Sequence, residues 1–159
     1  MNRSFIDVRA ESHFSIQNLP YGVFRPKSGG APRIGVAIGE YVLDLSILDE
    51  AGCFQTTSFA GKGIFGMDSL NAFMALGRTD WREARSIIQR LLSDNEPTLR
   101  DNEVLREASL VRQRDVEMLL PAHIGDYTDF YASKHHATNV GTMFRGSENA
   151  LMPNWVNLP

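Results

Sequence analysis

The residues best suited to chemistry lie close together between Pro121 and Arg145, in the sequence PAHIGDYTDFYASKHHATNVGTMFR. This stretch contains carboxylates, aromatic rings, two adjacent histidines and an arginine. Carboxylates can bind a hard metal ion, a histidine can act as a general base near neutral pH, and an arginine can hold a substrate carboxylate. The rest of the chain is poorer in reactive side chains, so this stretch is the candidate site.

The two carboxylates of this stretch leave two interpretations open. Asp126 and Asp129 are three residues apart, and either could contribute to a metal site. A hard cation such as Ca²⁺ or Mg²⁺ takes several oxygen ligands, so partners from elsewhere would be required. Aspartates in a turn-rich segment also cap backbone turns or the start of a helix. The spacing alone favours capping.

The two histidines lie in a segment with helical spacing of apolar residues. Ala137, Val140 and Phe144 fall on one face of such a helix. This arrangement places His136 close to the buried side and His135 away from it. His136 could be a general base if a carboxylate orients its second nitrogen, although an isolated histidine beside a helix is more often structural.

Two further residues have both a functional and a structural interpretation. Arg145 follows the expected helix and could hold a substrate carboxylate, or it could form a salt bridge or cap the C-terminal end of the helix. Tyr131 could donate a hydrogen bond to a ligand, or its hydroxyl could be satisfied at a domain edge. Taken alone, Arg145 is better explained by its structural role.

The elements that must position the stretch are predicted from the residues before it. The sequence RIGVAIGEYVLDL predicts a β-hairpin, because apolar residues alternate over 34–38 and 41–45 around a Gly39-Glu40 turn. A short strand is expected around Tyr21 and Val23. A further strand over 116–119 would lead the chain to the candidate site.

Helices are predicted between these strands. One runs from Asp68 to Leu76. A second follows at once, with apolar residues at helical spacing from Trp81 to Leu92 and a capping box formed by Asp80 and Glu83. Arginines on its other faces, at 82, 85 and 90, are expected to be solvated. Residues 93–114 are polar and mixed in charge, with a short helix possible over 102–107, which indicates a peripheral excursion or a linker.

Composition limits the classes of protein to consider. The chain has 159 residues and a net charge of -3 without a cluster of basic residues, so nucleic acid is not an expected partner. No membrane span or signal peptide is apparent, and Cys53 is the single cysteine, which excludes an intrachain disulfide. These features predict a cytoplasmic protein in which Cys53 is a buried structural thiol.

The stretch DYTDFYASKHHATNVGTMFRGSENALMPNW resembles the start of the catalytic domain in the fumarylacetoacetase family, the fumarylacetoacetate hydrolases of tyrosine and phenylalanine catabolism. This resemblance runs from Leu120 to Pro159. Upstream, NLPYGVF and the hairpin sequence resemble the SH3-like N-terminal barrel of the same family. The resemblance therefore covers the whole chain.

The resemblance implies a β-rich α+β fold in two parts. Residues 1–119 would form an SH3-like barrel with helical insertions, and residues 120–159 would open a mixed β-roll hydrolase domain. Because the family's other acidic metal ligands lie beyond Pro159, the chain is expected to be an N-terminal portion that is inactive alone. Partial exposure is expected for side chains that lack packing partners: Tyr131, Val140, Met143, Phe144 and Trp155.

The resemblance also implies roles for four residues. His136 would be the catalytic base, Asp129 a ligand of a divalent metal (Ca²⁺ or Mg²⁺), and Tyr131 and Arg145 contacts of a small diketo diacid substrate. The reaction would be hydrolysis of a carbon–carbon bond to release fumarate and acetoacetate, with the metal polarising the diketone oxygens. The full-length protein would be a homodimer. The alternative is a non-catalytic SH3-like domain that acts in assembly or interaction.

Overall fold

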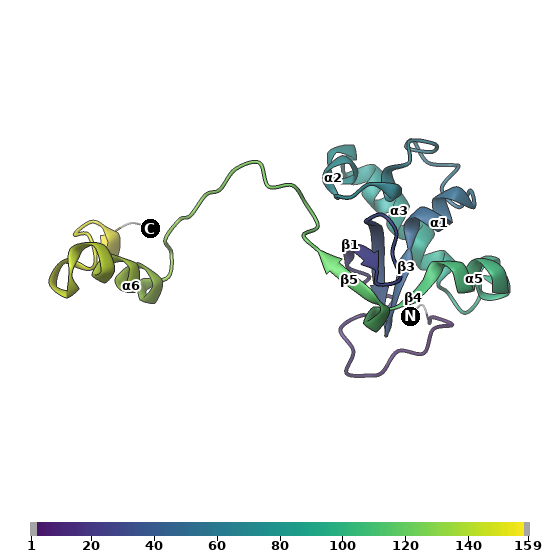
Figure 1. Cartoon of the computed structure of the whole chain (residues 1–159), viewed down its shortest axis with the longest axis horizontal. Helices are drawn as coiled ribbons and strands as arrows, with labels where there is room; N and C mark the ends of the chain where they lie inside the picture. The colour runs from purple at the N-terminus through teal and green to yellow at the C-terminus, as the bar shows by residue number, and fades with distance from the viewer. Residues whose placement is uncertain (1–2, 158–159) are drawn as a thin grey trace. The chain divides into compact units, whose positions relative to one another are not determined.

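The computed structural model describes residues 3–157, which fall into two compact units, one ending at His123 and one beginning at Ile124 (Figure 1). Leu158 and Pro159, where the resemblance ends, lie outside the described residues, as do Met1 and Asn2. Each unit has its own hydrogen-bonded elements, and they are described separately. The domain boundary expected between residues 119 and 120 remains a prediction.

The first unit is built on a five-stranded antiparallel sheet with the strand order β4-β3-β2-β1-β5. Its strands are β1 (Tyr21–Pro26), β2 (Arg33–Ile38), β3 (Tyr41–Asp44), β4 (Leu110–Arg112) and β5 (Val116–Leu119). Ile38 pairs with Tyr41 at the end of the predicted hairpin, and Gly39 has a φ of 54°, which a turn of this kind requires of its first residue. The hairpin and the strands at both ends of the unit are confirmed.

Both faces of this sheet carry buried side chains. One face, which includes Ile34, Val36 and Ile38, belongs to the main core of the unit. The opposite face carries a smaller cluster of Phe24 and Val42 with Val116. The alternation along the hairpin therefore sorts residues between two layers, as a strand with a side-chain period of two must.

Helices cover the main-core face of the sheet. They are α1 (Leu45–Glu50), α2 (Asn71–Leu76), α3 (Arg78–Leu91), α4 (Pro97–Arg100) and α5 (Glu103–Ser109). Figure 1 shows α1, α2, α3 and α5 on the same side of the strands, and the main core contains residues from these helices and from the sheet. The α+β class expected from the sequence is confirmed. The SH3-like barrel and the β-roll remain predictions.

The start of α3 differs from the expected capping box. Gly77 precedes the helix without a side-chain cap, and Asp80 lies inside the first turn, where its Oδ1 accepts a 2.5 Å hydrogen bond from Ser58 Oγ. Arg85 is not solvated as expected either. Its guanidinium donates to the main-chain carbonyls of Leu19 and Gln17 at 3.2 and 2.7 Å, so a long-range contact takes up a residue that the helical pattern placed on the surface.

Residues 93–114 are neither an excursion nor a linker. They form α4, α5 and the edge strand β4, and Leu99 is fully buried in the main core. Apart from the buried Ser109, their polar residues are exposed or half-buried. A strand as short as Leu110–Arg112 is too brief for its alternation to be recognised in the sequence.

The last residues of the first unit are held to α2. Leu70 N donates to Pro121 O at 2.7 Å, and Asn71 exchanges two hydrogen bonds with the main chain of His123, at 3.0 and 2.9 Å. These bonds continue the first unit beyond the end of β5, as far as its last residue, His123.

The second unit contains α6 (Lys134–Arg145) and two short 3₁₀ helices, η3 (Ser147–Asn149) and η4 (Trp155–Asn157). Ser133 caps α6 by accepting a 3.4 Å hydrogen bond from His136 N, and the helix predicted from the apolar spacing is confirmed. Among its described residues, only Ala137, Gly141 and Ala150 are buried. Across residues 3–157, the helices are all too short or too polar to span a bilayer.

Candidate functional site

Both aspartates of the candidate site hold main-chain turns. Asp126 Oδ1 accepts a hydrogen bond from Tyr127 N at 2.7 Å, and Asp129 Oδ1 accepts one from Tyr131 N at 2.9 Å. Short polar side chains commonly stabilise an irregular segment in this way. The structure thus contains the backbone contacts that the spacing favoured.

Tyr131 has an unusual backbone conformation. Its φ is 56°, in the left-handed region that a bulky residue rarely adopts. Two contacts hold it there: the hydrogen bond from its N–H to Asp129, and a 3.0 Å bond that Trp155 Nε1 donates to its carbonyl. A strained residue that is held by its surroundings is a recurrent feature of functional sites.

His136 lies beside both of these residues. Its Nε2 atom is 3.9 Å from Asp129 Oδ2, and its ring centroid is 5.1 Å from that of Tyr131. The side chain of His136 is 55% exposed, so the expectation that it is partly buried is wrong. The reason is that the apolar face of α6 has little to pack against, as shown by Phe144, which is 79% exposed.

Arg145 closes the end of α6 onto the following turn. Its Nε donates to Asn149 O at 3.1 Å, and its Nη2 donates to Ala150 O at 2.8 Å. The turn passes so close to the helix that a Cβ atom on Gly141 would lie 1.7 Å from Ala150 O. The guanidinium therefore has a structural role, but it binds carbonyls of the turn after α6 rather than those at the C-terminal end of the helix, and Nη1 is its remaining nitrogen.

Tyr131 joins the two halves of the candidate site. It contacts His136 as described, and it also lines a pocket of about 320 Å³ with Arg145 and Trp155. Asp129 and His136 do not line this pocket. Tyr131 is thus the residue that the contact with His136 and the pocket with Arg145 have in common.

Two residues near the site were not identified from the sequence. Trp155 supports the strained carbonyl of Tyr131, and Tyr127 lies against Asp129. The negative charge of Asp129, and then a hydrogen bond to it, raise the pKa of Tyr127. The alternation of tyrosines and aspartates in DYTDFY was a usable signal for Tyr127. No comparable pattern marks Trp155.

Residues 17–121 match the family described as Fumarylacetoacetase N-terminal. The chain belongs to this family.

Individual fumarylacetoacetases are similar over nearly the whole chain. Identity is 58% over 157 residues with fumarylacetoacetase of Arabidopsis thaliana, 58% over 157 residues with that of Dictyostelium discoideum, and 52% over 156 residues with that of Homo sapiens. These matches cover 99%, 99% and 98% of this chain but only 37%, 36% and 37% of the relatives. Because the similarity includes the second unit, a purely non-catalytic SH3-like domain is not favoured.

The residues of this fumarylacetoacetase-family chain do not by themselves fit a divalent metal ion. Within residues 3–157, no group of three or more histidine, cysteine, aspartate or glutamate side chains is placed to hold one. Asp129 offers a single carboxylate, and one of its oxygens already accepts a hydrogen bond from the main chain. Ca²⁺ and Mg²⁺ each take about six or more oxygen ligands, so this set is incomplete.

Cys53 lies in the first unit, outside the candidate site. It is half-buried and packs against the main core. Burial is the largest influence and raises the pKa of its thiol, with Arg90 acting in the opposite direction and Asp49 adding to the rise. A thiol with a raised pKa holds little thiolate at neutral pH, which agrees with the structural role expected from the sequence.

Proposed function

We propose that this chain is part of a hydrolase that cleaves fumarylacetoacetate into fumarate and acetoacetate. The observation that supports the proposal most directly is the contact of His136 with Asp129, 3.9 Å apart beside Tyr131, in a chain 58% identical to a fumarylacetoacetase over 157 residues. The pair lies at one end of α6, where a substrate can reach it because the histidine side chain is 55% exposed.

In this proposal His136 is the general base. A ring nitrogen takes a proton from water, and the resulting hydroxide attacks the carbonyl carbon next to the bond that breaks. The carbon–carbon bond then breaks, and its electron pair leaves with the acetoacetate fragment, which takes up a proton. Water therefore adds its hydroxyl to fumarate and its hydrogen to acetoacetate, so the reaction balances without an oxidant or reductant.

Tyr131 and Arg145 would bind the diketo diacid substrate. They line the same pocket of about 320 Å³, so a tyrosine and an arginine border one small volume. Arg145 already binds two main-chain carbonyls through Nε and Nη2, so Nη1 is the nitrogen proposed to contact a substrate carboxylate. Its two bonds to the turn after α6 would then position the same side chain for binding.

Asp129 would supply one ligand to a divalent cation, Ca²⁺ or Mg²⁺. The remaining ligands would have to come from outside the described residues, because these contain no cluster of three metal-binding side chains. A homodimer in the cytoplasm, with SH3-like residues 1–119 and a β-roll domain that opens at 120–159, completes the proposal. The five-stranded antiparallel sheet of the first unit is compatible with a small barrel.

A chimera tests the proposal. In it, this chain replaces the matching 157 residues of the Arabidopsis thaliana relative, with which it is 58% identical. We expect metal-dependent loss of fumarylacetoacetate absorbance. His136→Ala should lower kcat by about 100-fold or more, as loss of a general base does, without changing the thermal melting temperature. The neighbouring exposed His135 supplies the matched control, because His135→Ala should leave turnover within a few-fold.

Two outcomes would contradict the proposal. A chimera that folds and binds metal but does not consume fumarylacetoacetate would argue against the hydrolase function. Undiminished turnover in the His136→Ala chimera would leave the function standing but remove His136 as the base.

A further inference from the structure

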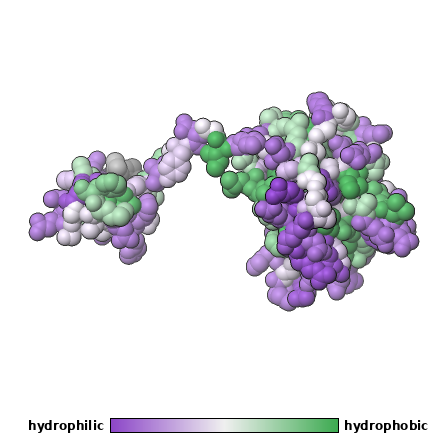
Figure 2. All heavy atoms as spheres, viewed as in Figure 1, coloured by the Kyte–Doolittle hydropathy of each residue, from purple (hydrophilic) through white to green (hydrophobic). Residues whose placement is uncertain are grey.

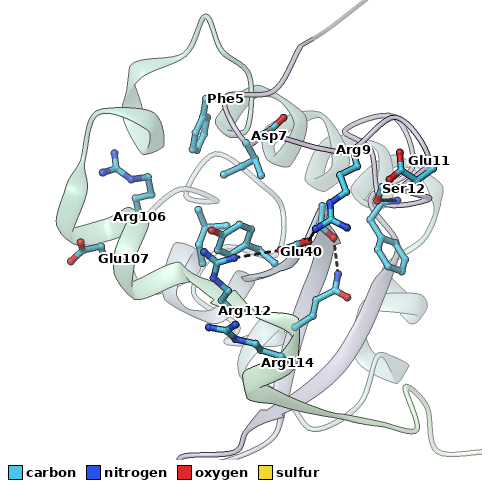
Figure 3. A pocket seen from close by; sticks show the side chains of 16 residues that line it. Phe5, Asp7, Arg9, Glu11, Ser12, Glu40, Arg106, Glu107, Arg112 and Arg114 are labelled. Carbon is cyan, nitrogen blue, oxygen red and sulfur yellow. Dashed lines mark hydrogen bonds and ion pairs between the residues drawn. The ribbon is translucent and has the colours of Figure 1, made fainter.

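A second, larger cleft lies in the first unit. Its volume is about 950 Å³, and its walls come from residues 5–14, 39–41 and 106–114 (Figure 3). None of the four candidate site residues lines it. Clefts that bind small molecules commonly enclose about 300–1,000 Å³, so this one is large enough for a ligand.

The centre of the cleft carries an excess of positive charge. Arg9 Nη2 is 2.6 Å from one oxygen of Glu40, and Arg112 Nη1 is 3.5 Å from the other. Figure 3 shows both guanidinium groups directed at this carboxylate. Two guanidinium groups share one carboxylate, which leaves a net charge of about +1, and the longer contact leaves Arg112 only weakly engaged.

Arg112 is held in position by the sheet. Its backbone pairs with Tyr41 across β3 and β4, and its guanidinium lies 4.7 Å from the centroid of the Tyr41 ring. The next residue, Gln113, donates from its main chain to Glu40 O at 2.9 Å and from its side chain to Gly39 O at 3.0 Å. A stacked guanidinium on a strand loses little conformational freedom when it binds a ligand.

The other charged residues of the cleft do not cancel this excess at its centre. Figure 3 shows the carboxylates of Asp7, Glu11 and Glu107 at the rim, pointing away from Glu40. The guanidinium of Arg106 is bound to the main-chain carbonyl of Arg100. Phe5 and Leu110 add an apolar wall to the same cleft.

We propose that this cleft binds a small organic carboxylate with a flat, apolar body. The ligand carboxylate takes the place of Glu40 opposite Arg112 and is also reached by Arg9. The apolar body lies against Phe5 and Leu110. A guanidinium fork matches a planar carboxylate, and the apolar wall favours a ligand that is more than a bare ion. This site goes beyond the proposed hydrolase function and does not depend on it.

Binding of 2-naphthoate and of its uncharged analogue 2-naphthamide to the purified chain, measured by calorimetry at low ionic strength, tests the charge requirement. We expect saturable binding of the carboxylate with a Kd below the millimolar range, roughly tenfold weaker binding of the amide, and weakening by added salt. Equal binding of the two probes, or no binding of naphthoate at millimolar concentration, would overturn the proposal.

Two variants with opposite expected effects on naphthoate affinity test whether the ligand binds in this cleft. Arg112→Gln should weaken naphthoate binding roughly tenfold, and Glu40→Gln should strengthen it several-fold, because it removes the competing negative charge. Arg9→Gln is a second test at a side chain that is 71% exposed, where substitution leaves the fold intact. Arg82→Gln is the matched control, since Arg82 is exposed on α3 and does not line the cleft.

Because Arg112→Gln should weaken naphthoate binding and Glu40→Gln should strengthen it, loss of structure cannot explain both results. Thermal melting of each variant shows whether the fold is retained. If naphthoate binding survives Arg112→Gln and Arg9→Gln but is lost on Arg145→Gln, the probe occupies the pocket of the second unit, and the proposal is overturned.

Discussion

The two units of the chain differ most in how they hold their shape. The first buries a core that joins the sheet to its helices, with Phe54, Phe59 and Phe65 at 1% exposure or less. The second buries only two alanines and a glycine among its described residues, while Phe130 and Phe144 are 89% and 79% exposed. Hydrophobic side chains reach the surface of the second unit beside hydrophilic ones (Figure 2).

The candidate site therefore lies in the second unit, which is the less well packed of the two. Chains shorter than about 40 residues seldom bury enough apolar surface to fold without additional support. The site is held instead by hydrogen bonds: Asp129 to the Tyr131 N–H, Trp155 to the Tyr131 carbonyl, and Arg145 to the turn after α6. Such bonds fix local geometry, but each contributes only about 1 kcal/mol to stability.

The largest expected change in stability comes from truncating a buried phenylalanine of the first unit, and comparing it with an exposed phenylalanine of the second unit tests the difference in packing. Phe65 is fully buried, and its ring contacts those of Phe54, Phe59 and Phe73. Phe65→Ala should lower the free energy of unfolding by about 3–5 kcal/mol, whereas Phe144→Ala should change it by no more than about 0.5 kcal/mol. Urea denaturation monitored by circular dichroism measures both. Similar losses in the two variants would show that the second unit packs as firmly as the first.

A smaller change in stability is expected at alkaline pH, and it depends on the hydroxyl of Tyr21 in the first unit. Burial raises the pKa of Tyr21 from 10.0 to about 12, with Arg85 acting against the rise, and its hydroxyl has no hydrogen-bond partner among the described residues. The native state therefore keeps the proton to higher pH than the unfolded chain does. This contribution to stability is present below pH 10.0 and is lost as the pH rises towards about 12.

Tyr21→Phe tests this linkage. The variant lacks the ionisable group, so between pH 10.0 and about 12 it should lose about 2–3 kcal/mol less stability than the native chain. At neutral pH its stability should lie within about 1 kcal/mol of the native value, because the deleted hydroxyl makes no hydrogen bond. Denaturation at several alkaline pH values checks both statements. Parallel losses in the two proteins would contradict the raised pKa.

The smallest change in global stability is expected for a substitution in the second unit, Gly141→Ala. A Cβ atom at Gly141 would lie 1.7 Å from Ala150 O, so Gly141→Ala must push the turn at 146–150 away from α6. Amide hydrogen exchange should show lost protection over 134–150, while the unfolding free energy of the first unit changes by no more than about 0.5 kcal/mol.

The control for this prediction lies in the same helix. Asn139 is exposed on α6, and Asn139→Ala should leave exchange over 134–150 unchanged or slower, since alanine favours a helix. Equal exchange in the two variants would mean that the close approach of helix and turn is unimportant.

Local patterns predicted the elements that depend on neighbouring residues. The hairpin over 34–45 and the helix that contains His136 followed from alternation and helical spacing. Elements defined by distant contacts escaped prediction. The strand β4 exists because it pairs with β3, and Arg85 lies against Leu19 and Gln17, more than sixty residues earlier in the chain.

The candidate site was likewise predicted only in part from the sequence. Residue types and family resemblance selected Asp129, Tyr131, His136 and Arg145, and their assigned roles remain proposals. The helical pattern could not show that His136 is exposed, because burial depends on what covers a helix face. Nor could it show that Arg145 binds the carbonyls of Asn149 and Ala150.

The sequence by itself determined the chemical groups available to this protein, its family and the elements that have a clear local pattern, such as the hairpin and α6, because these depend on residue identity and local spacing. Tertiary structure alone decided which groups meet. It brought His136 to Asp129 beside a strained Tyr131, and it joined Arg9, Glu40 and Arg112 from three distant segments into one cleft. Such contacts depend on the path of the whole chain, and no periodicity within one segment encodes them.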